Sequence, residues 1–408
     1  MTASASPKSR VLLYGPRFGR SIARGVGGGT GGYTRNMQTY LSSLEIEGFT
    51  LEPLFHTVRG EYSGALGIFP VRMVVDCWRI MVALLLRRPL AVHALAIYNS
   101  ALPREVFLAF ACNMLKTKLV YDIKGGRFIT RYETSNRLYK AGVAYILRSA
   151  SVVLAEGKIY QKFLFDKFGV QCHFFPNFVS SSEVPVAMPT RLAGKTLRLL
   201  FVGYCYEGKG VKSLLGGCAR AAQSGLRIEL ALIGQEDAAF KAFADSFSTP
   251  RSLLVKRLGV RSHDEVLAAM MHHDIYCYPT VHPGEGHSNS INEAMMSEMI
   301  IISTRHGFLR EAIGEDGAYF VGSAMEEEIA SAISTIAGEP DAARQKAARA
   351  RARLLSEFTS DKASCRLRVA YADMLGITSG SSPIQRGVSM AASESPTGTC
   401  LAETQDRP

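Results

Sequence analysis

The chain has 408 residues, of which 47% are hydrophobic and 20% are charged. This composition excludes a disordered or fibrous protein, and the length suits two domains rather than one core. The net charge is +11, and no Asp or Glu occurs before Glu45, which indicates an anionic partner or, more simply, a solvated basic face. Because the sequence has no zinc finger, recognition-helix signature or aromatic RNA-binding motif, we expect no nucleic-acid partner.

The features that decide the cellular compartment are weak but agree with one another. Eight cysteines are scattered without a CxxC pair, which favours a reducing compartment over a disulfide scaffold or a structural zinc site. The N-terminal segment MTASASPKSRVLLYG lacks the long apolar region of a signal peptide. The apolar run IMVALLL near residue 80 is too short to span a bilayer. We therefore expect a cytoplasmic protein.

The first predicted elements are a strand, a glycine-rich loop and a helix. The run RVLLYGP predicts a buried parallel strand, and the apolar spacing of the segment from Met37 to Leu44 predicts an amphipathic helix that ends before Gly48. Between them, the glycines from Gly25 to Gly32 can bring backbone N–H groups close to a phosphate. The glycine spacing is not GxGxxG, and no acidic residue ends the second apolar run, so a flexible turn without a ligand is the alternative.

Residues 68–98 combine apolar faces with arginines and contain the only tryptophan, Trp78. The arginines of this segment are Arg72, Arg79, Arg87 and Arg88. Such a helix is able to lie on an anionic membrane surface and meet a lipid-linked acceptor at the inner face of the cell membrane. A buried helix with basic ends is equally compatible with the pattern.

Apolar runs then alternate with helical stretches in two blocks. The runs AVHALAIYN, TKLVYDIKGG and ASVVLAEG predict a parallel sheet covered by helices on both faces. The segment FFPNFVSSSEVPVAMPTRLAGKT loses periodicity and predicts a linker. A second α/β block follows, with predicted strands in LRLLFVGYC, IELALIG, SLLVKRLG, DIYCYPT and MIIIST.

Two segments of the second block carry candidate chemistry. In FVGYCYEGKGVKSLL, Lys209 stands between two glycines at a strand-to-helix junction, where it is able to neutralise a diphosphate; an ordinary exposed lysine is the alternative. In GEGHSNSINEAM, Glu293 falls in the first turn of a helix, where the helix dipole alone favours a carboxylate. That explanation does not cover Glu285, which lies at the carboxyl edge of the sheet, where open α/β folds bind ligands.

The spacing of Glu285 and Glu293 resembles the EX7E motif of retaining GT-B glycosyltransferases of family 4. FVGYCYEGKGV, LIGQED, VKRLGVRSHDEVLAAMMHHDIYCYP, FFPNFV and GGYTRNMQTYLSSLEIEGF are similar to further segments of that family. The resemblance runs through about residues 11 to 375. It implies an α/β protein of the GT-B fold, with two Rossmann-like α/β/α domains facing a central cleft and a C-terminal helix packing back on the first domain. We expect an acceptor domain over 1–180, a nucleotide-sugar domain over 181–358, the returning helix over 359–377 and a disordered tail over 378–408.

The resemblance also implies roles for individual residues. Glu285 would hold hydroxyls of the transferred sugar, Lys209 would pair with the diphosphate, and Glu293 would accept hydrogen bonds from the ribose. Further donor contacts would come from Gly203, Tyr204, Leu258, Val260, Gly286, His287, Ser288, Asn289 and Ser290. Gly31 and Gly32 would bring the first domain against the donor phosphates.

Two positions depart from the family pattern. Tyr204 stands where many members have an arginine, so leaving-group stabilisation is expected to rest on Lys209 or on a neighbour such as Lys212. The segment VYDIKGG stands where a histidine often ends the strand, so Asp122 or Lys124 is expected to face the reaction centre, with Asp122 as a candidate catalytic residue.

No metal or other cofactor is expected. The chain has no DxD pair, which favours stabilisation of the leaving diphosphate by Lys209 and helix N-termini. A zinc site is the alternative, but its candidate ligands are spaced unlike any common zinc signature; they are His272, His273, Cys277, His282 and His287.

The sequence thus predicts a retaining, metal-independent glycosyltransferase that moves a sugar from a nucleotide-diphosphate sugar to a glycan or lipid-linked acceptor, in cell-surface polysaccharide biosynthesis. A non-catalytic nucleotide-sugar binder is one alternative. A dinucleotide-dependent oxidoreductase that uses the glycines at 25–32 is another, although it leaves the two glutamates and Lys209 without a role.

Overall fold

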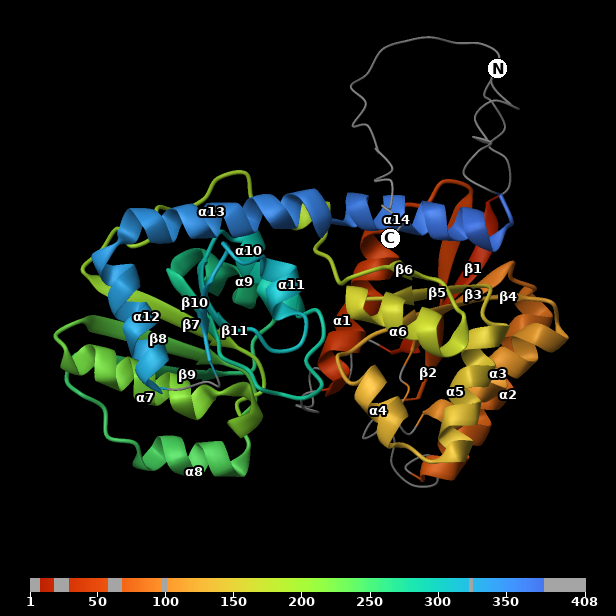
Figure 1. Cartoon of the computed structure of the whole chain (residues 1–408), viewed down its shortest axis with the longest axis horizontal. Coiled ribbons are helices and arrows are strands. Elements are labelled where there is room, and N and C mark those ends of the chain that lie inside the picture. The colour runs from red at the N-terminus through yellow and green to blue at the C-terminus, as the bar shows by residue number, and fades with distance from the viewer. Residues whose placement is uncertain are drawn as a thin grey trace, which may run out of the picture.

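The computed structural model describes residues 8–17, 29–57, 68–96, 98, 101–322 and 326–377. In this part of the chain, two parallel six-stranded sheets lie in separate halves (Figure 1). Helices cover the sheets, as expected for parallel strands buried on both faces. The predicted α/β architecture with two Rossmann-like halves is confirmed.

The first sheet has the strand order β2-β1-β3-β4-β5-β6. Its strands are β1 (Ser9–Pro16), β2 (Phe49–His56), β3 (Ala91–Ala96), β4 (Lys118–Ile123), β5 (Val152–Ala155) and β6 (Cys172–Phe174). Its helices are α1 (Gly29–Ser43), α2 (Phe69–Arg87), α3 (Leu102–Met114), α4 (Phe128–Thr134), α5 (Arg137–Ser149) and α6 (Lys158–Phe168). Successive side chains of β1 enter two different cores: Leu12 and Tyr14 pack with α2, α3 and α5, whereas Val11 and Leu13 pack with α1.

The second sheet has the order β12-β11-β10-β7-β8-β9 and one continuous core. Its strands are β7 (Thr196–Val202), β8 (Arg227–Ile233), β9 (Leu253–Gly259), β10 (Ile275–Tyr278), β11 (Ile300–Thr304) and β12 (Tyr319–Val321). Its helices are α7 (Val211–Gln223), α8 (Ala238–Ser246), α9 (His263–His272), α10 (Asn289–Met296), α11 (Leu309–Ile313), α12 (Glu326–Gly338) and α13 (Pro340–Glu357). Two 3-10 turns, η3 (Ser181–Glu183) and η4 (Glu207–Lys209), lie in the connections.

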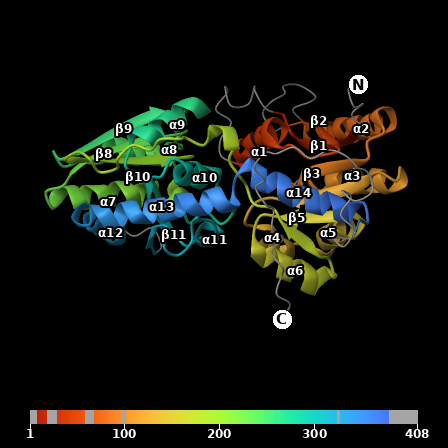
Figure 2. The same cartoon turned by 90° about the horizontal axis from the view of Figure 1, so that it is seen from above.

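The last helix, α14 (Ser360–Met374), returns to the first half. Leu367 and Tyr371 are fully buried against the first sheet, and α13 and α14 run along one side of both halves (Figures 1 and 2). The chain crosses between the halves twice, and the crossings pair through a bridge from Val179 to Thr359. We propose that the domain boundaries lie here, at about 180 and 358. The expected tail, 378–408, lies outside the described residues.

All predicted strands are present, but three strands were not predicted, namely β2, β6 and β12. The glycine-rich segment also differs from its prediction, because α1 already begins at Gly29. Gly31 and Gly32 therefore belong to the first turn of a helix rather than to a loop, whereas residues 25–28 lie outside the described part. None of the described helices is long and apolar enough to cross a bilayer.

Candidate active site

Lys209 and Glu285 form a direct ion pair. Lys209 ends the turn η4 after β7, and Glu285 lies in the loop after β10, the strand next to β7. The Lys209 Nζ donates to Glu285 Oε2 at 2.5 Å and to Tyr278 Oη at 2.8 Å. Tyr278 Oη and Thr280 Oγ1 donate to the same carboxylate at 3.1 and 3.0 Å. Glu285 is only 7% exposed, and these three side-chain donors compensate its burial.

The loop that carries Glu285 is wedged between glycines of two other segments. Gly126, which follows β4 of the first half, donates its N–H to Gly284 O at 3.3 Å. A Cβ at Gly126 would lie 1.9 Å from Glu285 O, and a Cβ at Gly307 would lie 2.4 Å from that oxygen. Neither position has room for a side chain without backbone movement. The first half is thereby in van der Waals contact with the loop beside the ion pair.

Glu293 lies in a neighbouring ionic cluster that also spans the two halves. Its Oε1 is 3.9 Å from Arg35 Nε of α1 and 3.6 Å from His263 Nδ1 of α9. Arg35 also pairs with Glu183 at 3.1 Å. Burial raises the pKa of Glu293, while His263 and Arg35 oppose that rise. Burial raises the pKa of Tyr276, and the negative charges of Glu285 and Glu293 raise it further. Tyr276 is therefore near both glutamates.

Four side-chain amides and two peptide carbonyls form a hydrogen-bond network at the junction between the halves. Asn36 of α1 donates to Asn177 Oδ1 at 2.9 Å and accepts from Asn289 Nδ2 at 2.8 Å. Asn177 in turn donates to His287 O at 2.5 Å, and its own carbonyl accepts from Asn292 at 2.9 Å. The network fixes the backbone at 287–292, where the donor contacts are expected. Asn36 and Asn177 lie in two of the segments that resemble the family, GGYTRNMQTYLSSLEIEGF and FFPNFV, but neither was predicted to have a role.

Glu156, at the end of β5, was missed by sequence reasoning. It is 2% exposed, accepts the Gly125 N–H at 2.5 Å, and also accepts the N–H of His287 from the second half. A Cβ at Gly286 would lie 1.8 Å from Glu156 Oε1. Burial raises the pKa of Glu156 to about 7, although Lys124 and the two N–H groups oppose the rise. Its signal in the sequence is a single carboxylate directly after an apolar strand.

Asp122 and Lys124 do not reach the ion pair. Asp122 is fully buried, where its Oδ2 accepts Tyr40 Oη at 3.0 Å and lies 3.4 Å from His93 Nε2. Lys124 is 2% exposed, lies 3.3 Å from Asp122 Oδ1 and donates to Phe175 O at 2.8 Å. The two charges neutralise each other inside the first half, because an unpaired charge there would be costly. That either side chain faces the reaction centre stays a prediction; these contacts of theirs lie within the first half.

The other expected donor residues are distributed over the carboxyl ends of β7 to β10. Gly203 donates its N–H to Ile233 O at 2.9 Å, and a Cβ at Gly234 would lie 1.8 Å from Gly203 O. Tyr204 packs beside Tyr206 with ring centroids 5.3 Å apart. The remaining positions follow the same edge: Leu258 is half-buried, Val260 is 50% exposed, and the hydroxyls of Ser288 and Ser290 lie 3.1 Å apart.

His287 and Gly32 differ sharply in their surroundings. The His287 ring is 2% exposed and lies 4.7 Å from the ring of Phe358, and burial lowers the pKa of His287 to about 3. The ring is therefore closed off from a ligand, and the backbone N–H and carbonyl of His287 already bind Glu156 and Asn177. At Gly32, a Cβ would have no atom of the described residues within 4 Å. Gly32 thus meets no side chain or backbone of the part of the chain that the structure describes.

Tyr204 stands where a second cation for the diphosphate was expected. Lys212 was a candidate to replace that cation, but its contacts lie elsewhere. Lys212 lies 3.5 Å from Glu207 and over the ring of Phe243. Arg127, which follows the glycine pair after β4, is closer to the Glu285 loop: its Cδ would lie 3.2 Å from a Cβ at Gly284. Burial and the positive charges of Lys209 and Arg127 lower the pKa of His282. Arg127 was not among the predicted site residues.

The candidate zinc ligands have separate partners. His272 and His273 each contact a carbonyl of their own helix, Cys277 is buried in the sheet, and His282 lies 2.5 Å from Tyr206 Oη. Within the described ranges, no three His, Cys, Asp or Glu side chains are grouped to hold a metal ion.

Comparison with known proteins agrees with this geometry. The family model described as glycosyl transferases group 1 matches residues 196–339, which hold Lys209, Glu285 and Glu293. No curated protein sequence matches the chain. The match to the family model supports a glycosyltransferase.

Solved structures cover nearly the whole chain. HepE from Anabaena, in complex with UDP and glucose, has a TM-score of 0.61 at 13% identity over 90% of this chain and 99% of its own. Sucrose-phosphate synthase from Thermosynechococcus elongatus reaches 0.65 at 14% identity, over 91% and 100%. The N-terminal domain of trehalose-6-phosphate phosphatase from Candida albicans reaches 0.66 at 9% identity, over 93% and 99%. At these identities the likeness concerns the fold, and the expected GT-B fold is confirmed.

Proposed function

We propose that this protein is a retaining glycosyltransferase of the family 4 type that moves a sugar from a nucleotide-diphosphate sugar to a glycan or lipid-linked acceptor. The observation that carries the proposal is the buried pair of Lys209 and Glu285, which lies at the carboxyl edge of the second sheet and in contact with the first half. Parallel sheets bind their ligands at this edge. The family match over 196–339 and the UDP named with HepE support a nucleotide-sugar donor.

The pair offers both charges that the reaction needs. When the bond from the anomeric carbon to the diphosphate oxygen breaks, negative charge grows on the leaving nucleoside diphosphate, and the ammonium of Lys209 is available to stabilise it. Glu285, released from Lys209, accepts hydrogen bonds from hydroxyls of the transferred sugar. The acceptor hydroxyl forms the new bond on the same face of the sugar, and its proton passes to the departing phosphate oxygen. Metal is not required in this scheme.

The remaining roles follow the expected donor site. Glu293 accepts hydrogen bonds from the ribose hydroxyls, which replace its present contacts with Arg35 and His263. The nucleotide is bordered by Gly203, Tyr204, Leu258 and Val260. Backbone groups of 286–290 contact the phosphates and the sugar. Gly31 and Gly32 approach the phosphates from α1, where a Cβ at Gly32 would meet no described residue within 4 Å. Arg127 replaces the arginine that is missing at position 204.

We place the protein in the cytoplasm, at the inner face of the cell membrane, in cell-surface polysaccharide biosynthesis. Helix α2 supports membrane contact, because Val74, Trp78 and Leu86 on it are 69%, 66% and 79% exposed. Exposed apolar groups beside arginines favour an anionic lipid surface.

The test is release of nucleoside diphosphate from a panel of nucleotide sugars by the purified protein. We expect at least one donor to be consumed, and Glu285→Gln and Lys209→Ala to lower the rate by roughly 10²–10³-fold. The matched control is Lys256→Ala, which breaks the exposed pair with Glu229 at 2.7 Å and should leave the rate unchanged. Binding of a nucleotide sugar without turnover would favour the non-catalytic alternative, and binding of NAD in its place would favour the oxidoreductase.

A further inference from the structure

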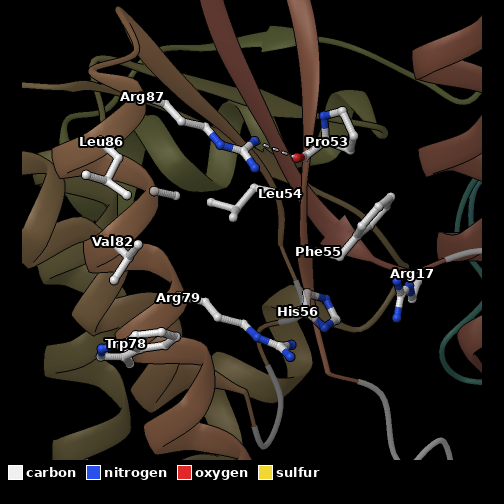
Figure 3. A pocket seen from close by; sticks show the side chains of 11 residues that line it. Arg17, Pro53, Leu54, Phe55, His56, Trp78, Arg79, Val82, Leu86 and Arg87 are labelled. Carbon is white, nitrogen blue, oxygen red and sulfur yellow. Dashed lines mark hydrogen bonds between the residues drawn. The ribbon is translucent and has the colours of Figure 1, made fainter.

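A groove of about 380 Å³ lies between the edge strand β2 and helix α2 (Figure 3). Arg17, the residue after β1, and His56, the last residue of β2, line it near the carboxyl edge of the first sheet. Leu86 and Arg87 line it at the far end of α2. Neither Lys209 nor Glu285 lines this groove.

The described residues that line the groove carry positive charge, and none of them is a carboxylate. The charged ones are Arg17, Arg79 and Arg87. Arg79 has Asp76 at 4.0 Å, but Asp76 already receives Arg104 at 2.7 Å and the hydroxyl of Thr57 at 2.9 Å. Arg87 donates to Pro53 O at 3.2 Å and lies 4.0 Å from Glu52 outside the groove. The positive charge of Arg79 is therefore only weakly compensated and is available to an anion.

His56 adds a buried acceptor. It is 4% exposed, and its Nδ1 lies 3.0 Å from Thr57 O, so that nitrogen carries the proton and donates. Burial and the charge of Arg104 lower the pKa of His56 well below its usual range, which keeps the ring neutral. Its Nε2 then presents a lone pair, and it has no hydrogen-bond partner among the described residues. A buried acceptor without a partner needs a donor such as a hydroxyl.

The wall formed by α2 is apolar and open to solvent. Trp78 and Leu86 are 66% and 79% exposed, and Val82 lies between them on the same helix. An alkyl chain laid along these side chains would remove apolar surface from water. The groove thus offers a cation and a hydroxyl acceptor at one end and a hydrocarbon surface along its length.

We propose that this groove binds the acceptor as a lipid-linked saccharide phosphate, with the phosphate at Arg17 and Arg79, a hydroxyl of the adjoining sugar donating to His56 Nε2, and the lipid chain along Trp78, Val82 and Leu86. The inference rests on the proposed function in so far as the ligand is the acceptor. Strand β2 stands three strands from β4, whose following residue Gly126 touches the Glu285 loop. The phosphate would therefore lie roughly 14 Å to the side of the transfer site. This spacing leaves room for the saccharide that connects the phosphate to the hydroxyl that receives the new sugar.

Binding is measured through the fluorescence of Trp78, which is the only tryptophan of the chain. The probes are dodecyl phosphate, the dodecyl ester of glucose 1-phosphate, free glucose 1-phosphate and the uncharged dodecyl glucoside. Each dodecyl compound is used below its critical micelle concentration. We expect saturable binding of both alkyl phosphates, with the ester tighter, and weaker binding of the other two by about tenfold or more. Arg79→Ala should weaken both alkyl phosphates by about tenfold, and His56→Phe should abolish only the advantage of the ester.

The control is Arg310→Ala, an exposed arginine paired with Glu315 in the second half, which should change nothing. Equal affinity for dodecyl glucoside, or no effect of Arg79→Ala, would overturn the phosphate site. Equal affinity for free glucose 1-phosphate would overturn the lipid part and indicate a soluble sugar phosphate. The binding measurement needs no turnover. It can therefore contradict the acceptor groove without contradicting nucleotide-sugar cleavage, and a failure of cleavage leaves the binding result unaffected.

Discussion

Glycine at position 126 sets how closely the first half approaches the Glu285 loop. Because a Cβ there would lie 1.9 Å from a backbone oxygen of the other half, we expect Gly126→Ala to force the halves apart. Turnover should fall by about tenfold or more, since a displaced constellation loses its alignment, and the radius of gyration from X-ray scattering should rise.

Gly338→Ala is the matched control for that substitution, because a Cβ at the end of α12 would meet no atom of the described residues within 4 Å. If Gly126→Ala kept the native radius of gyration and full turnover, the contact between Gly126 and the Glu285 loop would not belong to the working conformation.

Glu156 makes the association of the halves dependent on pH. Its pKa is raised from 4.5 to about 7 by burial, so the folded, closed state binds a proton that the unfolded chain has released. The stability it contributes is fully present below pH 4.5 and is lost as the pH rises through about 7, and it amounts to about 3 kcal/mol. Thermal unfolding of the wild type compared with Glu156→Gln should show this loss between pH 5 and pH 8.

The control for this titration is Glu47→Gln, which removes the same charge from an exposed turn. A difference between the wild type and Glu156→Gln that stayed constant from pH 5 to pH 8 would contradict the assignment of a proton to Glu156.

The helix α14 joins the second half to the first through a narrow apolar face. Leu367 is fully buried on it, whereas Val369, two residues further on, is 54% exposed. We expect Leu367→Ala to lower the free energy of unfolding by about 2–5 kcal/mol. Val369→Ala, in the same helix, should change it by less than about 0.5 kcal/mol. Equal effects in denaturant titrations would mean that α14 does not pack on the first sheet.

At the scale of elements, the sequence predicts those strands that form clear apolar runs. The strands β1, β3, β4, β5 and β7 to β11 are apolar runs, and all were predicted. Strand β2 was not, because Pro53 interrupts the sequence FTLEPLFH. The proline is tolerated since β2 is an edge strand, where a missing N–H breaks no ladder. Strands β6 and β12 have three residues each, too few for any period to be read.

At the scale of the molecule, some residues of the candidate site were predicted from sequence motifs, and others are brought to it only by the fold. Lys209 and Glu285 stand 76 positions apart and were expected together from the family resemblance. Glu156 and Arg127 approach the same loop from the other half; only the position of Glu156 directly after an apolar strand marks it in the sequence, and no local pattern marks Arg127. The contacts of Asp122 could not be predicted, because a strand-end position does not say which way a side chain turns. Here it turns into the sheet, toward His93 and Tyr40.

A crystal structure with a bound nucleoside diphosphate tests the central claim most directly. The account predicts that the diphosphate lies within about 3 Å of Lys209 Nζ, at the carboxyl ends of β7 and β10, and that the bond from Lys209 to Glu285 is broken or lengthened. A diphosphate bound elsewhere, with that ion pair intact, would contradict it.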